Sequence, residues 1–119
     1  MMESRKILVT KLVEYKAPIG DILEDLKSYG WDSEINLVTL TPFHLINVLE
    51  RFISNELSDV QVRNWANAIE HREDIGLLSE YKDTLDEMIF WLANPVINYP
   101  INKDLAIRVI KNLKSNNVQ

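Results

Sequence analysis

Cysteine is absent from this sequence, and glycine is scarce. Without cysteine the chain has neither disulfides nor thiolate metal ligands. The glycines Gly20, Gly30 and Gly76 are isolated from one another, so no GxGxxG or P-loop motif is present to bind phosphates. The sequence therefore excludes a disulfide scaffold and the common glycine-rich nucleotide sites.

Long apolar runs are also missing. No segment near the start has the apolar core and cleavage site of a signal peptide, and none approaches the roughly 20 residues of a membrane span. We therefore expect a cytoplasmic protein without membrane partners. Hydrophobic content of 46% and charged content of 26% are ordinary globular values. They predict one domain over residues 1–119, with a polar tail at 115–119.

Apolar residues recur along the chain at the three- and four-residue spacing of amphipathic helices. This spacing predicts an all-α, compact single-domain bundle of about six helices. They run from Ser4 to about Tyr15, over residues 22–29, from Thr41 to near Asn55, from Ser58 to no further than Gly76, from about Glu80 to Ala93, and from Asn102 to about Leu113.

The starts of these helices are marked by capping residues. Thr41 is a typical cap with Pro42 in the first helical position, and Ser58 with Gln61 has the spacing of a capping box. Residues 31–40 are less clear, because the segment has the composition of a short strand but no obvious partner strand elsewhere. We expect an extended linker there.

The helix over residues 80–93 has the widest apolar face, since Phe90 and Trp91 extend its apolar stripe. A helix that is apolar over most of its girth is usually central to its bundle, so this one is predicted to be the core element. Its stripe is expected to pack against the third and fourth helices. The predicted contacts join Leu85, Ile89 and Leu92 to Val62, Trp65, Ile69, Leu49 and Phe52.

The net charge of −5 is unevenly distributed. Residues 50–87 contain ten acidic and four basic side chains, a balance of −6, whereas the chain from residue 88 onward has a balance of +3. An acidic middle repels nucleic acid and attracts basic partners. A helix-turn-helix DNA binder, with Arg63 and Arg72 on its recognition helix, is therefore the least favoured reading.

The acidic middle supplies the predicted site. Glu70, Glu73 and Asp74 have the spacing that places carboxylates on one helix face while the helix persists. Like charges so placed weaken a helix, and such a conflict sometimes marks a functional surface. The alternative is a solvated helix end, with Arg72 as a counter-charge. The predicted partner-binding residues are Glu70, Glu73, Asp74, Asp83, Asp86 and Glu87.

Catalytic and metal-binding patterns find little local support. Glu70, His71 and Glu73 diverge around a helix, and no HExxH or EF-hand pattern is present. His44 has no serine, cysteine or paired acid beside it. We therefore predict no enzyme activity, metal or cofactor. A small metal-dependent hydrolase, built from Glu70, His71 and His44 if the fold brings them together, is kept as an alternative.

Tryptophans are frequent anchors of protein interfaces. Trp65 and Trp91 lie on or beside apolar stripes, where packing in the core is the simpler expectation. Trp31 lies between a predicted helix cap and Asp32, and it is the one that we expect at a surface.

Three segments in order carry a resemblance to a known group. They are LTPFHLINVLERFISNELS, WANAIEHREDIG and a helix closing on LANP, within about residues 39–113. The set resembles small helical bacterial immunity proteins of contact-dependent growth inhibition systems. The resemblance implies direct binding and neutralisation of a cognate toxin domain, often a nuclease. A helical protein-interaction module with another partner remains the alternative.

Overall fold

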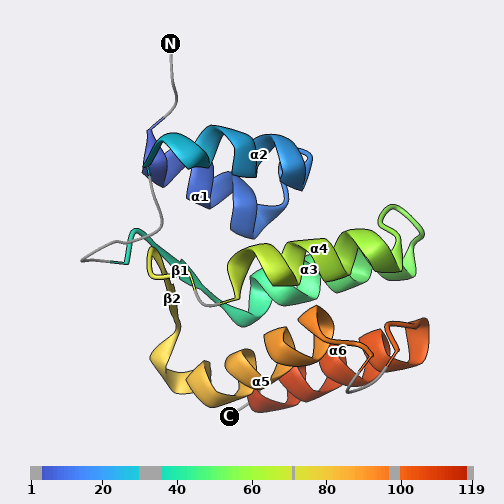
Figure 1. Ribbon diagram of the computed structural model, residues 1–119. Helices are drawn as coiled ribbons and strands as arrows, with labels where there is room; N and C mark the ends of the chain where they lie inside the picture. Colours follow the sequence, from blue (N-terminus) through green and yellow to red (C-terminus); the bar gives the residue numbers. More distant parts are fainter. Residues whose placement is uncertain (1–3, 30–35, 71, 97–99, 118–119) are drawn as a thin grey trace.

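The computed structural model describes residues 4–29, 36–70, 72–96 and 100–117, and these fold as an all-α domain with one very small sheet (Figure 1). The helices are α1 (Arg5–Glu14), α2 (Ile19–Leu26), α3 (Pro42–Ile53), α4 (Asp59–Ile69), α5 (Lys82–Ala93) and α6 (Lys103–Asn117). The strands are β1 (Val38–Leu40) and β2 (Ile75–Leu77), and 3₁₀ turns occur at Lys27–Tyr29 and Ser79–Tyr81. The predicted fold class and helix number are confirmed.

The helices form three layers of two (Figure 1). α3 and α4 lie in the middle, α1 and α2 cover one side, and α5 and α6 cover the other. α4 packs on α5 and α3 on α6, while α1 contacts both middle helices. The prediction that residues 80–93 form the central helix is therefore wrong. Ile89 is only 4% exposed but Phe90 is 41% exposed, because the outer side of α5 faces solvent.

Several capping predictions are confirmed. Ser58 and Gln61 form a reciprocal capping box, in which the Gln61 amide donates to the Ser58 hydroxyl at 3.1 Å and the Ser58 amide donates to Gln61 Oε1 at 2.8 Å. The Leu105 amide donates to Asn102 Oδ1 at 2.9 Å. Each cap satisfies amides that the first helical turn leaves without partners. These bonds fix where α4 and α6 begin.

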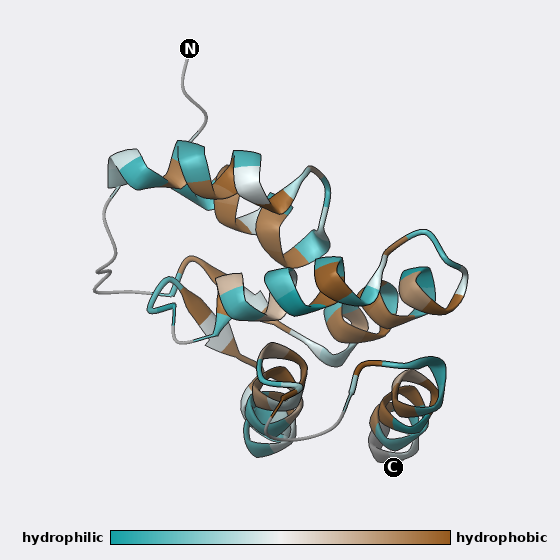
Figure 2. Cartoon of the chain, turned by 45° about the vertical axis from the view of Figure 1, so that its right-hand side comes forward, coloured by the Kyte–Doolittle hydropathy of each residue, from teal (hydrophilic) through white to brown (hydrophobic). Residues whose placement is uncertain are grey.

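One hydrophobic core joins the three layers. Trp65 of α4 is fully buried, and its indole Nε1 donates to the Leu12 carbonyl of α1 at 2.9 Å. Val62 and Ile69 of α4 are buried too, as expected for a stripe that faces α5. In Figure 2 hydrophobic residues face the interior of the molecule and hydrophilic residues lie mainly outside. The expectation that Trp65 belongs to the core is confirmed.

The small sheet corrects the prediction for residues 31–40, of which 31–35 lie outside the described residues. β1 pairs in parallel with β2, with Val38 opposite Ile75 and Leu40 opposite Leu77. β2 is not predicted from the sequence, because Ile75 and Gly76 lie within the limit given for the helix that begins at Ser58. At Gly76 in β2 an added Cβ would lie 2.5 Å from Oδ1 of Asn36, so a larger residue there would force the Asn36 side chain to move.

One helix end differs from prediction, and another lies within its predicted limit. α4 stops at Ile69, before Gly76, and Glu70 is already extended, with φ −61° and ψ 129°. α6 continues to Asn117, so the segment predicted as a polar tail is helical up to that residue. No helix in the described ranges combines the length and the apolar character needed to cross a bilayer.

Candidate functional site

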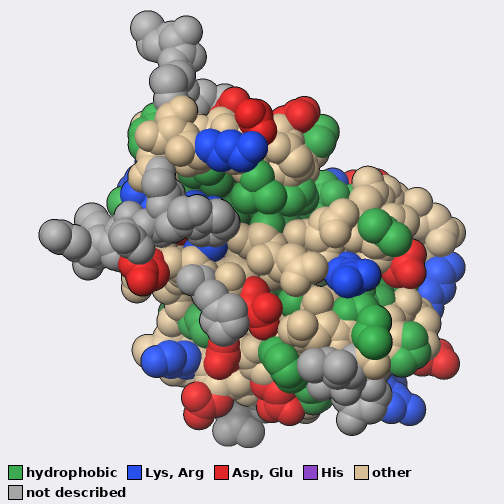
Figure 3. All heavy atoms as spheres, in the orientation of Figure 1, with side chains coloured by type: hydrophobic (Ala, Val, Ile, Leu, Met, Phe, Trp, Pro, Cys, Tyr) green, Lys and Arg blue, Asp and Glu red, His purple; other side chains and the backbone are tan. Residues whose placement is uncertain are grey.

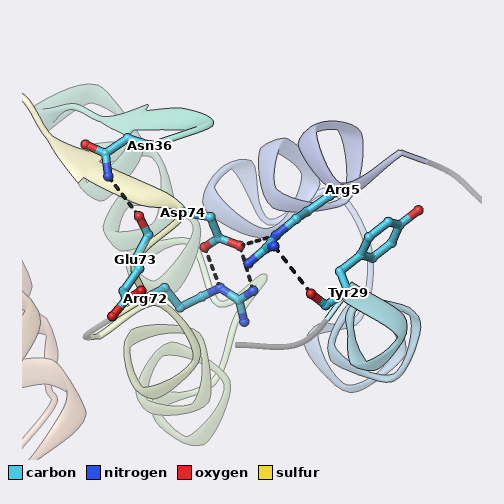
Figure 4. Close-up of polar contacts among 6 residues, drawn as sticks. All are labelled: Arg5, Tyr29, Asn36, Arg72, Glu73 and Asp74. Atoms are coloured by element: carbon cyan, nitrogen blue, oxygen red, sulfur yellow. Dashed lines mark hydrogen bonds and ion pairs between the residues drawn. The ribbon is translucent and has the colours of Figure 1, made fainter. Parts of the chain in front are cut away.

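A buried ion cluster lies at the turn between α4 and β2 (Figure 4). Asp74 is 0% exposed, and its two carboxylate oxygens accept hydrogen bonds from Nε and Nη2 of Arg72, both at 2.9 Å. Nε of Arg5, from α1, donates to Asp74 Oδ2 at 3.0 Å. Asp74 therefore joins the first helix to a turn almost seventy residues later.

The electrostatics of this cluster favour an ionised carboxylate. Burial on its own raises the pKa of Asp74, because it disfavours the charged form. The hydrogen bonds and positive charges of Arg72, followed by those of Arg5, outweigh that effect and hold the pKa below its ordinary value. The cluster is thus a structural ion pair of the buried kind.

Asp74 cannot belong to an exposed partner-binding face, which corrects the prediction made for it. The helical spacing assumed for Glu70, Glu73 and Asp74 does not apply either, since α4 ends before all three. Asp74 instead turns inward, while Glu73 is exposed and its backbone carbonyl accepts a hydrogen bond of 2.8 Å from the side-chain Nδ2 of Asn36 (Figure 4). The fold therefore separates the three acids of this run.

The other predicted acids remain on the surface. Asp83, Asp86 and Glu87 are exposed and share one face of α5, at the i, i+3 and i+4 spacing. Glu70 and Asp86 both border a small cavity of about 150 Å³ between the end of α4 and α5. Figure 3 shows acidic side chains gathered over this end of the molecule.

We call this surface the acidic face, and define it by five residues. They are Glu70, Glu73, Asp83, Asp86 and Glu87. Within the described residues, no ion pair or hydrogen bond holds the side chains of Asp83, Asp86 and Glu87. Their charges therefore act outward into solvent. Phe90 lies four residues after Asp86, so an exposed aromatic ring continues the same stripe.

The described residues give no support to the alternative of a metal-dependent hydrolase. His44 is part of the α3 start, where its Nδ1 accepts a hydrogen bond of 3.0 Å from the Thr41 amide. Burial lowers the pKa of His44, and the negative charge of Glu14 opposes this effect. His71, the second predicted member, lies outside the described residues. Among the residues that are described, no group of three or more histidine or acidic side chains could hold a metal ion.

Trp91 differs from Trp65. Trp91 is half-buried and borders a cleft of about 250 Å³ between α5 and α6, so the expectation of a fully packed core position holds only in part. Trp31 lies outside the described residues. The cleft was not predicted, because no sequence signal indicates that two consecutive helices pack on different neighbours and leave a gap between them.

A larger open pocket of about 500 Å³ lies between the α1–α2 and α3–α4 connections, and sequence analysis did not predict it. Arg51 crosses its wall, where its guanidinium lies 5.1 Å from the centre of the Tyr15 ring and Nη1 donates to the Tyr15 carbonyl at 2.9 Å. Arg51 also pairs with Glu56. Its charge is used within the fold, in bracing these two connections.

Comparison with family models, with curated proteins and with solved structures found no match to this chain. The site must therefore be interpreted from its own charges and geometry.

Proposed function

We propose that this chain is an immunity-type inhibitor, a binding protein that neutralises a basic bacterial toxin domain by covering that domain's active site with the acidic face. A nuclease is the kind of toxin that suits this surface best, because its active site is positively charged to receive phosphates. The inhibitor itself needs no catalytic group. It excludes the substrate by occupying the site.

The observation that carries the proposal is the exposed carboxylate stripe of α5. Asp83, Asp86 and Glu87 lie on one helix, so their spacing is fixed before a partner arrives. Carboxylates held on a rigid element steer a basic partner from a distance and lose little conformational freedom on binding. Phe90 adds an aromatic contact at the end of the stripe. Aromatic side chains of this kind are common anchors of interfaces.

The acids of the α4–β2 turn extend the surface beside α5. Glu70 borders the same small cavity as Asp86, and Glu73 is exposed in the turn. The buried Asp74 supports this turn through Arg5 and Arg72. In this proposal Asp74 therefore stabilises the fold and does not contact the partner.

A coexpression experiment tests the function. The gene beside this one is expected to encode the toxin domain, and production of the present chain should restore growth of cells that make that domain. Asp86→Lys/Glu87→Lys should abolish protection, whereas Glu24→Lys/Asp25→Lys, which changes the net charge equally on exposed positions of α2, should protect as the wild type does. Equal loss of protection in the two variants, or protection by neither the wild type nor its variants, contradicts the proposal.

A further inference from the structure

The outer layer of the molecule carries opposite charges on its two helices. α5 has a balance of −2 and α6 a balance of +3. The charged residues of α5 are Lys82, Asp83, Asp86 and Glu87, and those of α6 are Lys103, Asp104, Arg108, Lys111 and Lys114. All nine are exposed. The outer layer therefore has an acidic surface on α5, which we call the acidic strip, and a basic surface on α6, which we call the basic strip. Lys111 and Lys114 of the basic strip also border a shallow pocket on the α3 side of α6.

The two helices that carry the strips are nearly antiparallel. Both helices are seen almost end-on in Figure 2, and the chain runs along them in opposite directions in Figure 1. Their inner sides are covered by the middle layer, where α4 packs on α5 and α3 on α6. The side that faces away from the middle layer is not covered by any other described element.

A cleft of about 250 Å³ separates the strips. Its walls combine apolar side chains with a charged rim from α6. They are formed by Met88, Trp91, Leu105, Arg108, Val109 and Asn112. Met88, Leu105 and Val109 are buried, so Trp91 is the half-buried apolar group at the centre of the cleft. An apolar centre with charges on either side is the arrangement of a small protein interface.

We propose that this face binds a second copy of the chain. A twofold axis that runs between the copies, parallel to the helices, places α5 of each copy opposite α6 of the other. Each acidic strip then meets a basic strip, and the match occurs twice. A twofold axis in the same plane but perpendicular to the helices would place acid against acid. Charge alone thus selects one of the two arrangements.

The proposed dimer is weak and sensitive to salt. Exposed charge pairs contribute little individually and are screened at high ionic strength. The acidic strip of α5 is shared with the acidic face, so a basic toxin domain and a second copy compete for Asp83, Asp86 and Glu87. The dimer would cover these carboxylates until a stronger partner displaces the second copy.

Sedimentation equilibrium of the purified chain tests the proposal without any other protein. The wild type should dimerise reversibly, with a dissociation constant that rises roughly tenfold between about 0.05 M and about 0.5 M NaCl. Asp86→Lys/Glu87→Lys and Arg108→Glu/Lys111→Glu should each raise that constant by roughly tenfold or more. A wild type that stays monomeric at low salt would overturn the proposal and leave the face to foreign partners.

A mixture of the two charge-reversed variants provides the decisive test. Each variant places like charges opposite one another in its own dimer, but a one-to-one mixture pairs opposite charges at both contacts. The mixture should therefore recover dimers, as should a single chain that carries all four substitutions. Failure of both rescues contradicts the charge match.

The control is Glu24→Lys/Asp25→Lys on α2, which should dimerise as the wild type does, and far-ultraviolet circular dichroism should show all variants folded. If this control loses the dimer equally, net charge and not this face governs association, and the proposal is wrong. Because only the chain itself is used, the result leaves the toxin-binding proposal to be judged separately.

Discussion

Asp74 and Asp86 are the same residue type in the same acidic stretch, yet the fold uses them differently. Asp74 is completely buried and accepts hydrogen bonds from two arginines. Asp86 is exposed on α5 and has no such partner among the described residues. The comparison teaches that the surroundings of a carboxylate, and not its place in an acidic run, decide whether it stabilises the fold or is available to a partner.

The difference follows from what each segment contacts. The turn containing Asp74 lies against α1, which supplies Arg5, so ionisation there is compensated inside the protein. Among the described residues, none packs against the outer face of α5. Its charges interact with solvent and with whatever approaches.

Replacing Asp74 by asparagine should have the largest effect. The substitution leaves Arg5 and Arg72 without their shared counter-charge in a buried site, a change that typically costs about 3–5 kcal/mol of unfolding free energy. Urea denaturation measures the loss. Asp86→Asn is the matched control and should change stability by no more than about 0.5 kcal/mol. A loss below about 1 kcal/mol at position 74 would contradict the structural role of the cluster.

The inner and outer sides of α5 offer a second contrast. Ile89→Ala should cost about 2–5 kcal/mol, because Ile89 is 4% exposed and its removal leaves a cavity in the core. Phe90→Ala should cost less, about 1 kcal/mol, since that ring is 41% exposed. Thermal or urea unfolding compares the two. Equal losses would mean that Phe90 is packed as tightly as its neighbour.

Low pH should destabilise the folded protein by protonating Asp74. The pKa of Asp74 is lowered in the folded state, so its contribution to stability is complete above about pH 3.9, the unfolded value. The contribution declines below that pH and is lost as the pH falls through the folded pKa. The wild type should therefore lose more stability in this acid range than Asp74→Asn does. Parallel stability curves for the two proteins, measured by urea denaturation at each pH, would exclude a lowered pKa.

The smallest effect is expected at His44. Burial lowers the pKa of His44 in the folded state, so the neutral ring is favoured. Nδ1 of this neutral ring accepts a hydrogen bond from the Thr41 backbone amide. Its contribution is complete above about pH 6.5 and declines as the pH falls below that value towards the folded pKa. His44→Gln keeps an acceptor at this capping position without titrating. Its stability should thus vary less than that of the wild type between about pH 5 and pH 7, and an unchanged slope would contradict the assignment.

Much of the fold was predictable because local signals agreed with the packing. The capping box of Ser58 and Gln61 and the apolar stripe of α4 each specify a helix without knowledge of its neighbours. The pairing of β1 with β2 was not predictable in this way, since strands of three residues have a weak signal and their partners are distant in sequence. The centre of the bundle was misassigned for a related reason. Composition shows that α5 is apolar, but not which side remains in solvent.

The candidate site was predicted only in part. The exposed positions of Asp83, Asp86 and Glu87 follow from helical spacing opposite Leu85 and Ile89, which sequence analysis can supply. The fate of Asp74 depends on Arg5, a residue almost seventy positions away, and no local pattern pairs the two. Because this pairing buries Asp74, only five of the six predicted binding residues can belong to an exposed face. Whether the remaining five bind a partner stays a prediction.

The contrast between Asp74 and Asp86 is best tested by the rate at which the chain associates with the basic toxin domain that the proposed function expects to be encoded beside its gene. Stopped-flow measurements of folded proteins should show a wild-type rate that falls by roughly tenfold between about 0.05 M and about 0.5 M salt. Asp86→Lys/Glu87→Lys should associate slowly, with little dependence on salt. Asp74→Asn, measured where it remains folded, should keep the wild-type rate and slope. A rate that depends on Asp74 as strongly as on Asp86, or that ignores the α5 substitutions, would contradict the separation of a stabilising carboxylate from a binding face.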